Sequence, residues 1–231
     1  MNSIRFIKEF FWNEELCAHG RGKGHTELFL RQGDLDGACA VYSLMMMLMI
    51  HKKVNRKELV DRAAAQHLTD GGYNSYMRLQ DHILGELPGR YQNGYFFTEV
   101  ADKLHQCFKK EATASVHQAF KKKANSKAKK ELGKIITETI NAGYPVEIGF
   151  TSKKGYGHAV IAIGYTNYYT DLRLFCLDPS YDLGKTAFWN SIIDIDYFDP
   201  GTAIYSDKYF TPDGELDVIT VDEILTIDVD K

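Results

Sequence analysis

The order of the hydrophobic patterns along the chain constrains the fold most strongly. Before about Asn141 the apolar residues recur mainly at helical spacing, whereas after Gly143 they form short runs typical of strands. A chain that places its helices first and antiparallel strands later is expected to adopt an α+β fold. Its 231 residues suffice for a sizeable core. We therefore expect a single domain over residues 1–231, with a mainly helical lobe over 1–141 and a mainly β lobe over 142–231.

The expected elements are separated by turn and capping signals. Apolar spacing predicts helices over Cys39 to about Lys52, Arg56–His67, Tyr73–Leu87, Phe97 to as far as Phe120, and Lys127–Asn141. Short apolar runs bounded by turn residues predict strands over Thr26–Arg31, Tyr144–Phe150, His158–Tyr165, Leu172–Asp178, Phe188–Ile195 and Val218–Val229. Asn55, with Glu58 three residues later, forms a capping-box pattern before the second helix.

The composition argues against several classes of protein. Hydrophobic residues make up 44% and charged residues 26% of the chain, which is the balance of a folded domain rather than a disordered one. A formal net charge of −3 gives no reason to expect nucleic acid or an anionic membrane as a partner. The longest apolar run, Leu44–Ile50, is far too short to cross a bilayer. We expect no nucleic-acid binding and no membrane insertion, and the sequence does not predict an oligomeric state.

Charged residues near the N-terminus bear on localisation. Lys8, Glu9, Glu14 and Glu15 interrupt the apolar residues of Met1–Glu15, which has none of the three regions of a signal peptide. We therefore expect a cytoplasmic protein. A protein secreted by a signal-independent route would have the same N-terminus.

One of the four cysteines stands in a special position. Cys17, Cys39, Cys107 and Cys176 match no zinc-binding spacing, and a chain of this size does not need disulfides, so we expect free thiols. Cys39 follows the glycine-containing loop Gln32–Gly37 and opens an apolar helix, where backbone N–H groups and the helix dipole stabilise a thiolate. Taken alone, a cysteine in this position is more often a small buried residue, as we expect of Cys107 and Cys176.

His158 and Asp178 are candidates for the base and orienting acid that a reactive thiolate requires. His158 opens a predicted strand, and Asp178 ends the next one. His158 and Asp178 each lie ten residues from Tyr168. If the two strands form an antiparallel hairpin that turns near Tyr168, and no bulge shifts the register, the two residues lie at the same end of the hairpin. In this hairpin, His158 Nδ1–H is expected to point to the Asp178 carboxylate, leaving Nε2 for Cys39.

Several stretches resemble motifs of papain-like cysteine peptidases. The run Gln32–Ala40 resembles the Gln…Gly-x-Cys motif of that superfamily. The runs Asn141–Val146, Gly157–Tyr165 and Leu177–Ser180 are similar to one bacterial branch, the peptidases related to the leader-cleaving domain of double-glycine bacteriocin exporters. The order Gln, Cys, His, Asp is also that of the family, and the set spans most of the chain.

The resemblance implies a papain-like fold and a role for each site residue. The N-terminal helical half would carry the nucleophile, Cys39, at a helix start, and the C-terminal antiparallel sheet would carry the base, His158, and the acid that orients it, Asp178. Gln32 and the Cys39 backbone N–H would donate to the oxyanion. Gln32 stands seven residues before Cys39, slightly farther than in papain, and its alternative role is a solvated loop amide. The resemblance implies no metal and no organic cofactor.

Four other features have a functional and a simpler interpretation. Lys121–Lys130 contains six lysines in ten residues, expected to be a solvated surface, with a docking patch for an acidic partner as the alternative. His19 and His25 suit a mobile surface loop better than a metal site. Glu147 is expected on the solvent side of an edge strand rather than in the cleft. Trp189 is expected to be a core aromatic rather than a shield over the His–Asp bond.

The expected function is cysteine-dependent acyl transfer to water, that is, hydrolysis of a peptide or amide bond in a protein or peptide through a Cys39 thioester. Two alternatives stay open. One is a catalytically lapsed, peptidase-fold binding protein, because fold does not imply activity. The other is a transglutaminase- or deamidase-type effector that acts on other proteins. A dedicated leader peptidase is not the default expectation, because a long helical insert separates Cys39 from the strands.

Overall fold

The computed structural model describes residues 3–21, 24–33, 38–60, 74–83, 94–118, 126–168, 171–197 and 206–228. Within them the helices are α1 Cys39–Ile50, α2 Arg56–Val60, α4 Ser75–His82, α5 Phe97–Phe108 and α6 Ser126–Asn141. The strands are β1 Arg5–Phe6, β2 Phe10–Asn13, β3 Glu15–His19, β4 His25–Glu27, β5 Thr113–Gln118, β6 Val146–Ser152, β7 Gly157–Tyr168, β8 Asp171–Leu177, β9 Ser191–Asp196, β10 Asp207–Phe210 and β11 Leu216–Asp228.

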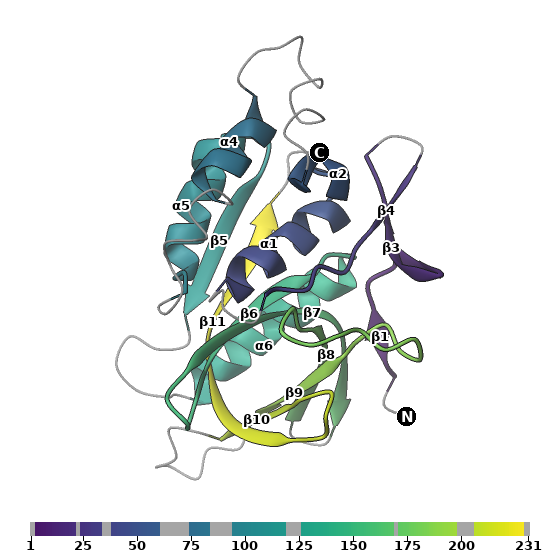
Figure 1. Ribbon diagram of the computed structural model, residues 1–231. Helices are drawn as coiled ribbons and strands as arrows, with labels where there is room; N and C mark the ends of the chain where they lie inside the picture. The colour runs from purple at the N-terminus through teal and green to yellow at the C-terminus, as the bar shows by residue number, and fades with distance from the viewer. Residues whose placement is uncertain are drawn as a thin grey trace.

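Most of the strands form one eight-stranded antiparallel sheet. Seven of them follow the order β1-β7-β6-β11-β10-β9-β8, and the eighth, β5, pairs with β11. A further pairing between β7 and β8 closes strands β6 to β11 into a ring (Figure 1). β1 reaches β7 at Gly164, where an added Cβ would lie 2.3 Å from the Phe6 ring, so the close approach of the two strands requires a glycine. Separate helices beside a large antiparallel sheet confirm the predicted α+β class.

Helix α1 forms the centre of the core. Nearly all of its residues are buried, including the run Leu44–Ile50, because the helix packs against β6 and β7 of the ring, against β3 and against α5. Figure 1 shows α1 lying between the ring and the group formed by α4, α5 and β5. A helix that is apolar on all sides is typical of a central core position. Its first residue, Cys39, is therefore attached to a helix that is packed on all sides.

Several predicted elements agree with the structure. The cap of α2 has the expected box contact, because the Asn55 N–H donates to Glu58 Oε2 at 2.8 Å. Helix α6 ends at Asn141, and Gly143 adopts a φ of 97°, as the helix-ending role of this glycine predicted. The predicted parts of the second helix over 61–67, and of the third helix at 73 and over 84–87, lie outside the described residues.

Other predictions are wrong in the half before Asn141. The fourth helix does not continue toward Phe120: it ends at Phe108, Lys109 takes a φ of 52°, and Thr113–Gln118 form strand β5 on β11. The strand expected over Thr26–Arg31 is limited to β4, and β1, β2 and β3 were not expected. The helical extrapolation failed because a short segment of mixed residues has no period of its own, and pairing with β11 decides its structure.

Part of the lysine-rich stretch is not solvated. Lys129, on α6, is 5% exposed and donates to Asp207 Oδ1 at 2.7 Å and to Ser206 Oγ at 2.6 Å. Burial raises the pKa of Asp207, and the adjacent Lys129 partly offsets this effect. The ion pair attaches α6 to β10, whereas residues 121–125 of the stretch lie outside the described residues.

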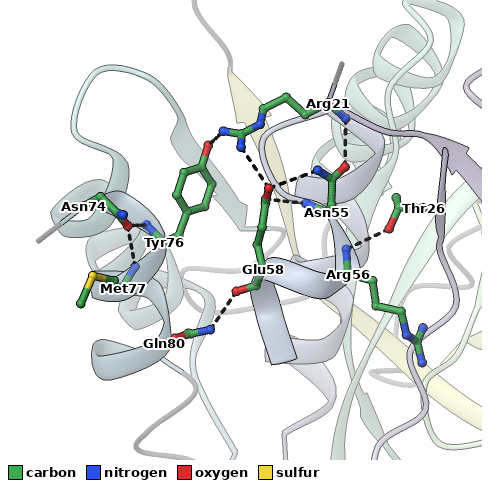
Figure 2. A network of polar contacts seen from close by, with 9 residues as sticks. All are labelled: Arg21, Thr26, Asn55, Arg56, Glu58, Asn74, Tyr76, Met77 and Gln80. Carbon is green, nitrogen blue, oxygen red and sulfur yellow. Dashed lines mark hydrogen bonds and ion pairs between the residues drawn. The ribbon is translucent and has the colours of Figure 1, made fainter. Parts of the chain in front are cut away.

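A polar network attaches the small β2-β3-β4 sheet to the helices (Figure 2). Arg21, just after β3, donates from Nη2 to Glu58 Oε1 at 3.0 Å, and its backbone N–H donates to Asn55 Oδ1 at 3.0 Å. The Arg21 guanidinium also donates to the hydroxyl of Tyr76 on α4 and lies over the ring of that residue. One arginine thus joins the end of a hairpin to both α2 and α4.

No helix among the described ranges combines the length and the apolar character needed to cross a membrane.

Candidate active site

Cys39 is placed by the start of α1. The helix begins at this residue, so its N–H is one of the first-turn donors that have no acceptor within the helix. The N-terminal position also exposes the thiol to the positive end of the helix dipole. Cys39 is partly buried, whereas Cys17, Cys107 and Cys176 are buried, and all four are free thiols, as predicted. Cys39 is consequently the most accessible of the four.

His158 lies at the start of β7, opposite Phe150 of β6. The Phe150 ring meets the imidazole edge-on with 5.5 Å between ring centroids, and the Tyr209 ring lies at 6.3 Å. The hairpin before His158 is held by Asp217, which accepts from Tyr156 and from Ser152, each at 2.6 Å. These contacts fix the imidazole in a largely water-free position.

Asp178 follows β8 and is completely buried. Its Oδ1 accepts from His158 Nε2 at 2.8 Å and from the Ser180 N–H at 2.8 Å, and its Oδ2 accepts from the Tyr209 hydroxyl. Asn190 holds the backbone of Asp178 on both sides, accepting from its N–H at 2.7 Å and donating to its carbonyl at 2.9 Å. A buried carboxylate with three donors is both satisfied and fixed in orientation.

The thiol and the carboxylate contact the same imidazole, because the Cys39 side chain also hydrogen-bonds to His158. The predicted ring orientation is wrong: Nε2, not Nδ1, contacts Asp178, which leaves Nδ1 for the sulfur. The predicted register also differs. Tyr168 pairs with Asp171, and a bulge between Ala162 and Gly164 shifts the pairing, so that Leu177 faces Ile161. The His158 side chain therefore reaches across to Asp178 rather than lying directly opposite it.

The electrostatics of the three groups are strongly coupled. Burial alone would raise the pKa of the Cys39 thiol, but His158 more than offsets this effect, and the pKa falls below its usual 9.0. Burial alone would lower the pKa of His158, but Asp178 and Cys39 raise it well above 6.5. The pKa of Asp178 is lowered below 3.8, because His158 and Tyr209 outweigh its burial. The opposite shifts of thiol and imidazole favour a thiolate–imidazolium pair.

Gln32 lines the same cleft but makes a contact that the sequence did not predict. Its side-chain Nε2 donates to Ser180 Oγ at 2.8 Å, and its backbone N–H donates to the Pro179 carbonyl at 2.8 Å. The amide nitrogen has a second hydrogen that remains available for another acceptor. Residues 34–37, which join Gln32 to α1, lie outside the described residues.

A cleft of about 620 Å³ opens beside Cys39 and His158. Its walls come from the start of α1, the segment before α5, the end of β5, strands β6 and β7, and β11. The lining residues are Gln32, Cys39, Ala40, Gly94, Tyr95, Phe96, Phe97, Gln118, Gly149, Phe150, Thr151, Gly155, Tyr156, Gly157, His158, Ala159, Asp222 and Glu223. The thiol and the imidazole thus face a space large enough for several side chains of a peptide.

The structure confirms one of the predictions for the other candidate residues and contradicts the rest. Glu147 is not on an edge strand: β6 lies between β7 and β11, and the side chain is completely buried. Trp189 packs in the predicted aromatic core role, with ring centroids 5.4 Å from Phe6 and 4.9 Å from Phe175. His19 and His25 pair across β3 and β4 rather than lying in a loop. Within the described ranges, no three His, Cys, Asp or Glu residues gather as metal ligands would.

A family model matches more than half of the chain. The Peptidase_C39 like family matches residues 28–192, which include Gln32, Cys39, His158 and Asp178. None of the curated proteins matches the chain.

Proposed function

The chain belongs to the Peptidase_C39 like family, and we propose that it is a cysteine peptidase that hydrolyses a peptide or amide bond through a thioester on Cys39. The family indicates a cysteine peptidase-type function. The finer assignment of roles rests on the thiol, imidazole and carboxylate that meet at one side of the cleft.

In the acylation step, the Cys39 thiolate attacks the carbonyl carbon of the substrate, and negative charge moves to the carbonyl oxygen. The Cys39 N–H and the free amide hydrogen of Gln32 donate to this oxygen. Each such donor contributes a factor of about 10² to 10³ in rate. The imidazolium of His158 gives its proton to the leaving nitrogen, the C–N bond breaks, and a thioester and an amine result.

In the deacylation step, neutral His158 takes a proton from water as the water oxygen attacks the thioester carbonyl. The C–S bond breaks, the carboxylic acid leaves, and the thiolate–imidazolium pair returns. Asp178 remains ionised throughout, because its pKa is lowered. Its role is to hold Nε2–H, so that Nδ1 faces the sulfur and the reacting atoms.

One arrangement carries the proposal: Cys39 and His158 line the same cleft, His158 Nε2 contacts Asp178 Oδ1 at 2.8 Å, and in this setting the pKa of Cys39 is lowered while the pKa of His158 is raised. A buried structural cysteine has its thiol pKa raised instead, as burial does to Cys107, whose pKa rises to about 11. A lapsed peptidase has no need to keep an activated thiolate in its cleft.

Brief alkylation with substoichiometric iodoacetamide, followed by mass spectrometry, tests the proposal. Cys39 should react far faster than Cys17, Cys107 and Cys176, and at a pH well below 9. Hydrolysis of a peptide library by the protein, but not by Cys39→Ala, completes the test. Uniform labelling of the four thiols, or a library left uncut by a protein with a fast Cys39, would favour the binding-protein alternative.

A further inference from the structure

Strand β11 has a bulge at the cleft. Val221 pairs with Phe150 and Glu223 pairs with Gly149, so Asp222 is an extra residue in β11. In a regular strand consecutive side chains point to opposite faces, whereas a bulge changes the direction of one of them. Both Asp222 and Glu223 consequently line the cleft that holds Cys39 and His158.

Both carboxylates are held in place by neighbouring elements. Asp222 Oδ2 accepts from the hydroxyl of Thr151 on β6. Glu223 accepts from the Phe97 N–H at the start of α5 at 3.4 Å, and from Gln118 Nε2 at the end of β5 at 3.3 Å. Because an ionised carboxylate can accept about four hydrogen bonds, each retains free lone pairs for a ligand.

The described residues that line the cleft include no lysine or arginine that would balance the negative charge of this wall. Burial raises the pKa of Asp222, and the adjacent Glu223 raises it further, which shows that the two carboxylates repel each other. A cation between them would relieve this repulsion. Charge of one sign in a low-dielectric cleft also concentrates ligands of the opposite sign.

A third carboxyl group lies beneath the same wall. Glu147 shares a face of β6 with Gly149 and Thr151, two residues that line the cleft. Glu147 is completely buried, and neither carboxyl oxygen has a hydrogen-bond partner within the described residues. Burial raises its pKa well above 4.5, and Cys39 and Glu223 add to the shift. A buried carboxyl without a partner is costly, and the raised pKa favours its neutral form.

Aromatic side chains line the same cleft as the two carboxylates. Phe96, before α5, is 69% exposed, and Tyr156, before β7, is 43% exposed, although both line the cleft. Aromatic faces attract cations and also cover the apolar stems of long basic side chains. The combination of two carboxylates with aromatic neighbours suits the side chain of lysine or arginine better than that of any other amino acid.

We propose that Asp222 and Glu223 determine specificity by binding a lysine or arginine side chain of the substrate next to the bond that Cys39 attacks. This inference rests on the proposed function, because it names the substrate class of that same cleft. The carboxylates bind the ammonium or guanidinium group, and the aromatic residues cover its methylene stem.

Charged thiol reagents test the cleft without requiring any turnover. The Cys39 thiolate displaces methanesulfinate from an aminoethyl or a sulfonatoethyl methanethiosulfonate reagent and forms a mixed disulfide. Each rate is divided by the rate of the same reagent with 2-mercaptoethanol, and Cys39→Ala confirms the labelled site. The normalised ratio of cationic to anionic reagent should be about tenfold or more at low salt, and should fall at high salt.

The variant Asp222→Asn/Glu223→Gln should lose most of this preference, because the amides keep the shapes of the acids but not their charges. Glu131→Gln/Glu138→Gln is the matched control, because it removes two charges from exposed positions on α6 outside the cleft lining. The control should retain the preference. A ratio near one in the unaltered protein, or one that the Asp222/Glu223 variant leaves unchanged, would overturn the inference.

A second arm compares peptides that carry lysine or norleucine at each position around the scissile bond. Norleucine has nearly the same stem without the charge. At one position the lysine peptide should have a kcat/KM about tenfold higher, and the Asp222/Glu223 variant should remove this advantage. If lysine and norleucine peptides are cut equally, the inference fails and the proposed function stands. If no peptide is cut, the proposed function fails, and the reagent ratio still decides whether the cleft selects cations.

Discussion

Two buried carboxylates in this molecule have nearly the same surroundings but different consequences. Glu58, at the start of α2, accepts from Arg21 Nη2 at 3.0 Å and from the N–H and side-chain nitrogen of Asn55 at 2.8 and 3.1 Å (Figure 2). Asp178 accepts from His158, from the Ser180 N–H and from the Tyr209 hydroxyl. Each carboxylate thus accepts three hydrogen bonds.

The two networks differ in what else the donor to each carboxylate contacts. The Arg21 guanidinium also donates to the hydroxyl of Tyr76. The contacts drawn in Figure 2 therefore join a hairpin to two helices and include no residue of the candidate site. The imidazole that contacts Asp178 also interacts with the thiol of Cys39, and both line the cleft. The same kind of contact therefore joins parts of the fold in one region and orients the proposed base in the other.

Of the variants that test this comparison, His158→Ala should have the largest effect on turnover. Turnover should fall by about 10⁴-fold or more, because the variant loses both the base and the acid of the proposed reaction. Glu58→Ala is the matched control in the other network, and it should retain turnover in the folded protein. Hydrolysis of the best peptide from the library measures both. A His158→Ala protein with near-normal turnover would contradict the proposed roles.

The same variant should change the pH dependence. The favourable imidazolium is lost while the burial of Cys39 remains, so the pH midpoint of Cys39 alkylation should rise. Because the folded pKa of His158 lies above 6.5, its contribution to stability is fully present below pH 6.5 and is lost as the pH rises through the folded pKa. Urea unfolding across this range should show less pH dependence in His158→Ala.

A smaller loss of activity is expected for Asp178→Ala. Turnover should fall by about 10²-fold, because His158 keeps its place between two rings but loses the acceptor for Nε2–H. The free energy of unfolding should fall by about 3 kcal/mol, since buried donors lose their partner. Asp178→Asn should be milder in both respects, because the amide oxygen can still accept one of these bonds. An Asp178→Ala protein of normal stability would show that the carboxylate is not the centre of its network.

The sequence contains signals for only part of the candidate site. Cys39, His158 and Asp178 could be proposed as site residues because each stands in a local motif, and local motifs do not depend on how strands pair. Tyr209 and the bulge at Asp222 could not, because β10 was not expected and a bulge is a property of pairing. A tyrosine in a short strand carries no signal that its hydroxyl meets a carboxylate 31 residues earlier.

Burial was the other quantity that the sequence could not supply. Glu147 and Lys129 stand in segments whose neighbours are compatible with either a solvated or a buried face. Only the strand order, which puts β6 between β7 and β11, makes Glu147 internal. Only the packing of α6 on β10 gives Lys129 its partner, Asp207. Charged residues are rarely buried, so the solvated interpretation was the better prediction in both cases and was wrong in both.

Tyr209→Phe should have a moderate effect. Asp178 would lose the donor to Oδ2, and its pKa should rise, because this bond helps to lower it. We expect a loss of about threefold to tenfold in kcat with little change in KM, and a higher pKa of His158 in a pH titration followed by NMR, because the ionised carboxylate loses a donor that competes with the imidazolium. Tyr165→Phe is the control, because it removes a hydroxyl that donates to Asn141 instead. A normal His158 titration in Tyr209→Phe would assign a purely structural role to this hydroxyl.

The smallest effect on the reaction is expected for Arg21→Ala. The variant removes the ion pair with Glu58 and the contact with the Tyr76 ring, so the free energy of unfolding should fall by about 1 to 2 kcal/mol. The backbone N–H that donates to Asn55 remains, and the capping contact between Asn55 and Glu58 does not involve the guanidinium, so the hairpin keeps one of its attachments. The alkylation rate of Cys39 and its pH midpoint should stay unchanged in the folded protein, because no contact of this network reaches His158 or Asp178 among the bonds drawn in Figure 2. Urea unfolding and timed alkylation on the same samples give both quantities. A shifted midpoint in Arg21→Ala would mean that the two networks are coupled through α1, and that the fold-stabilising network also tunes the thiol.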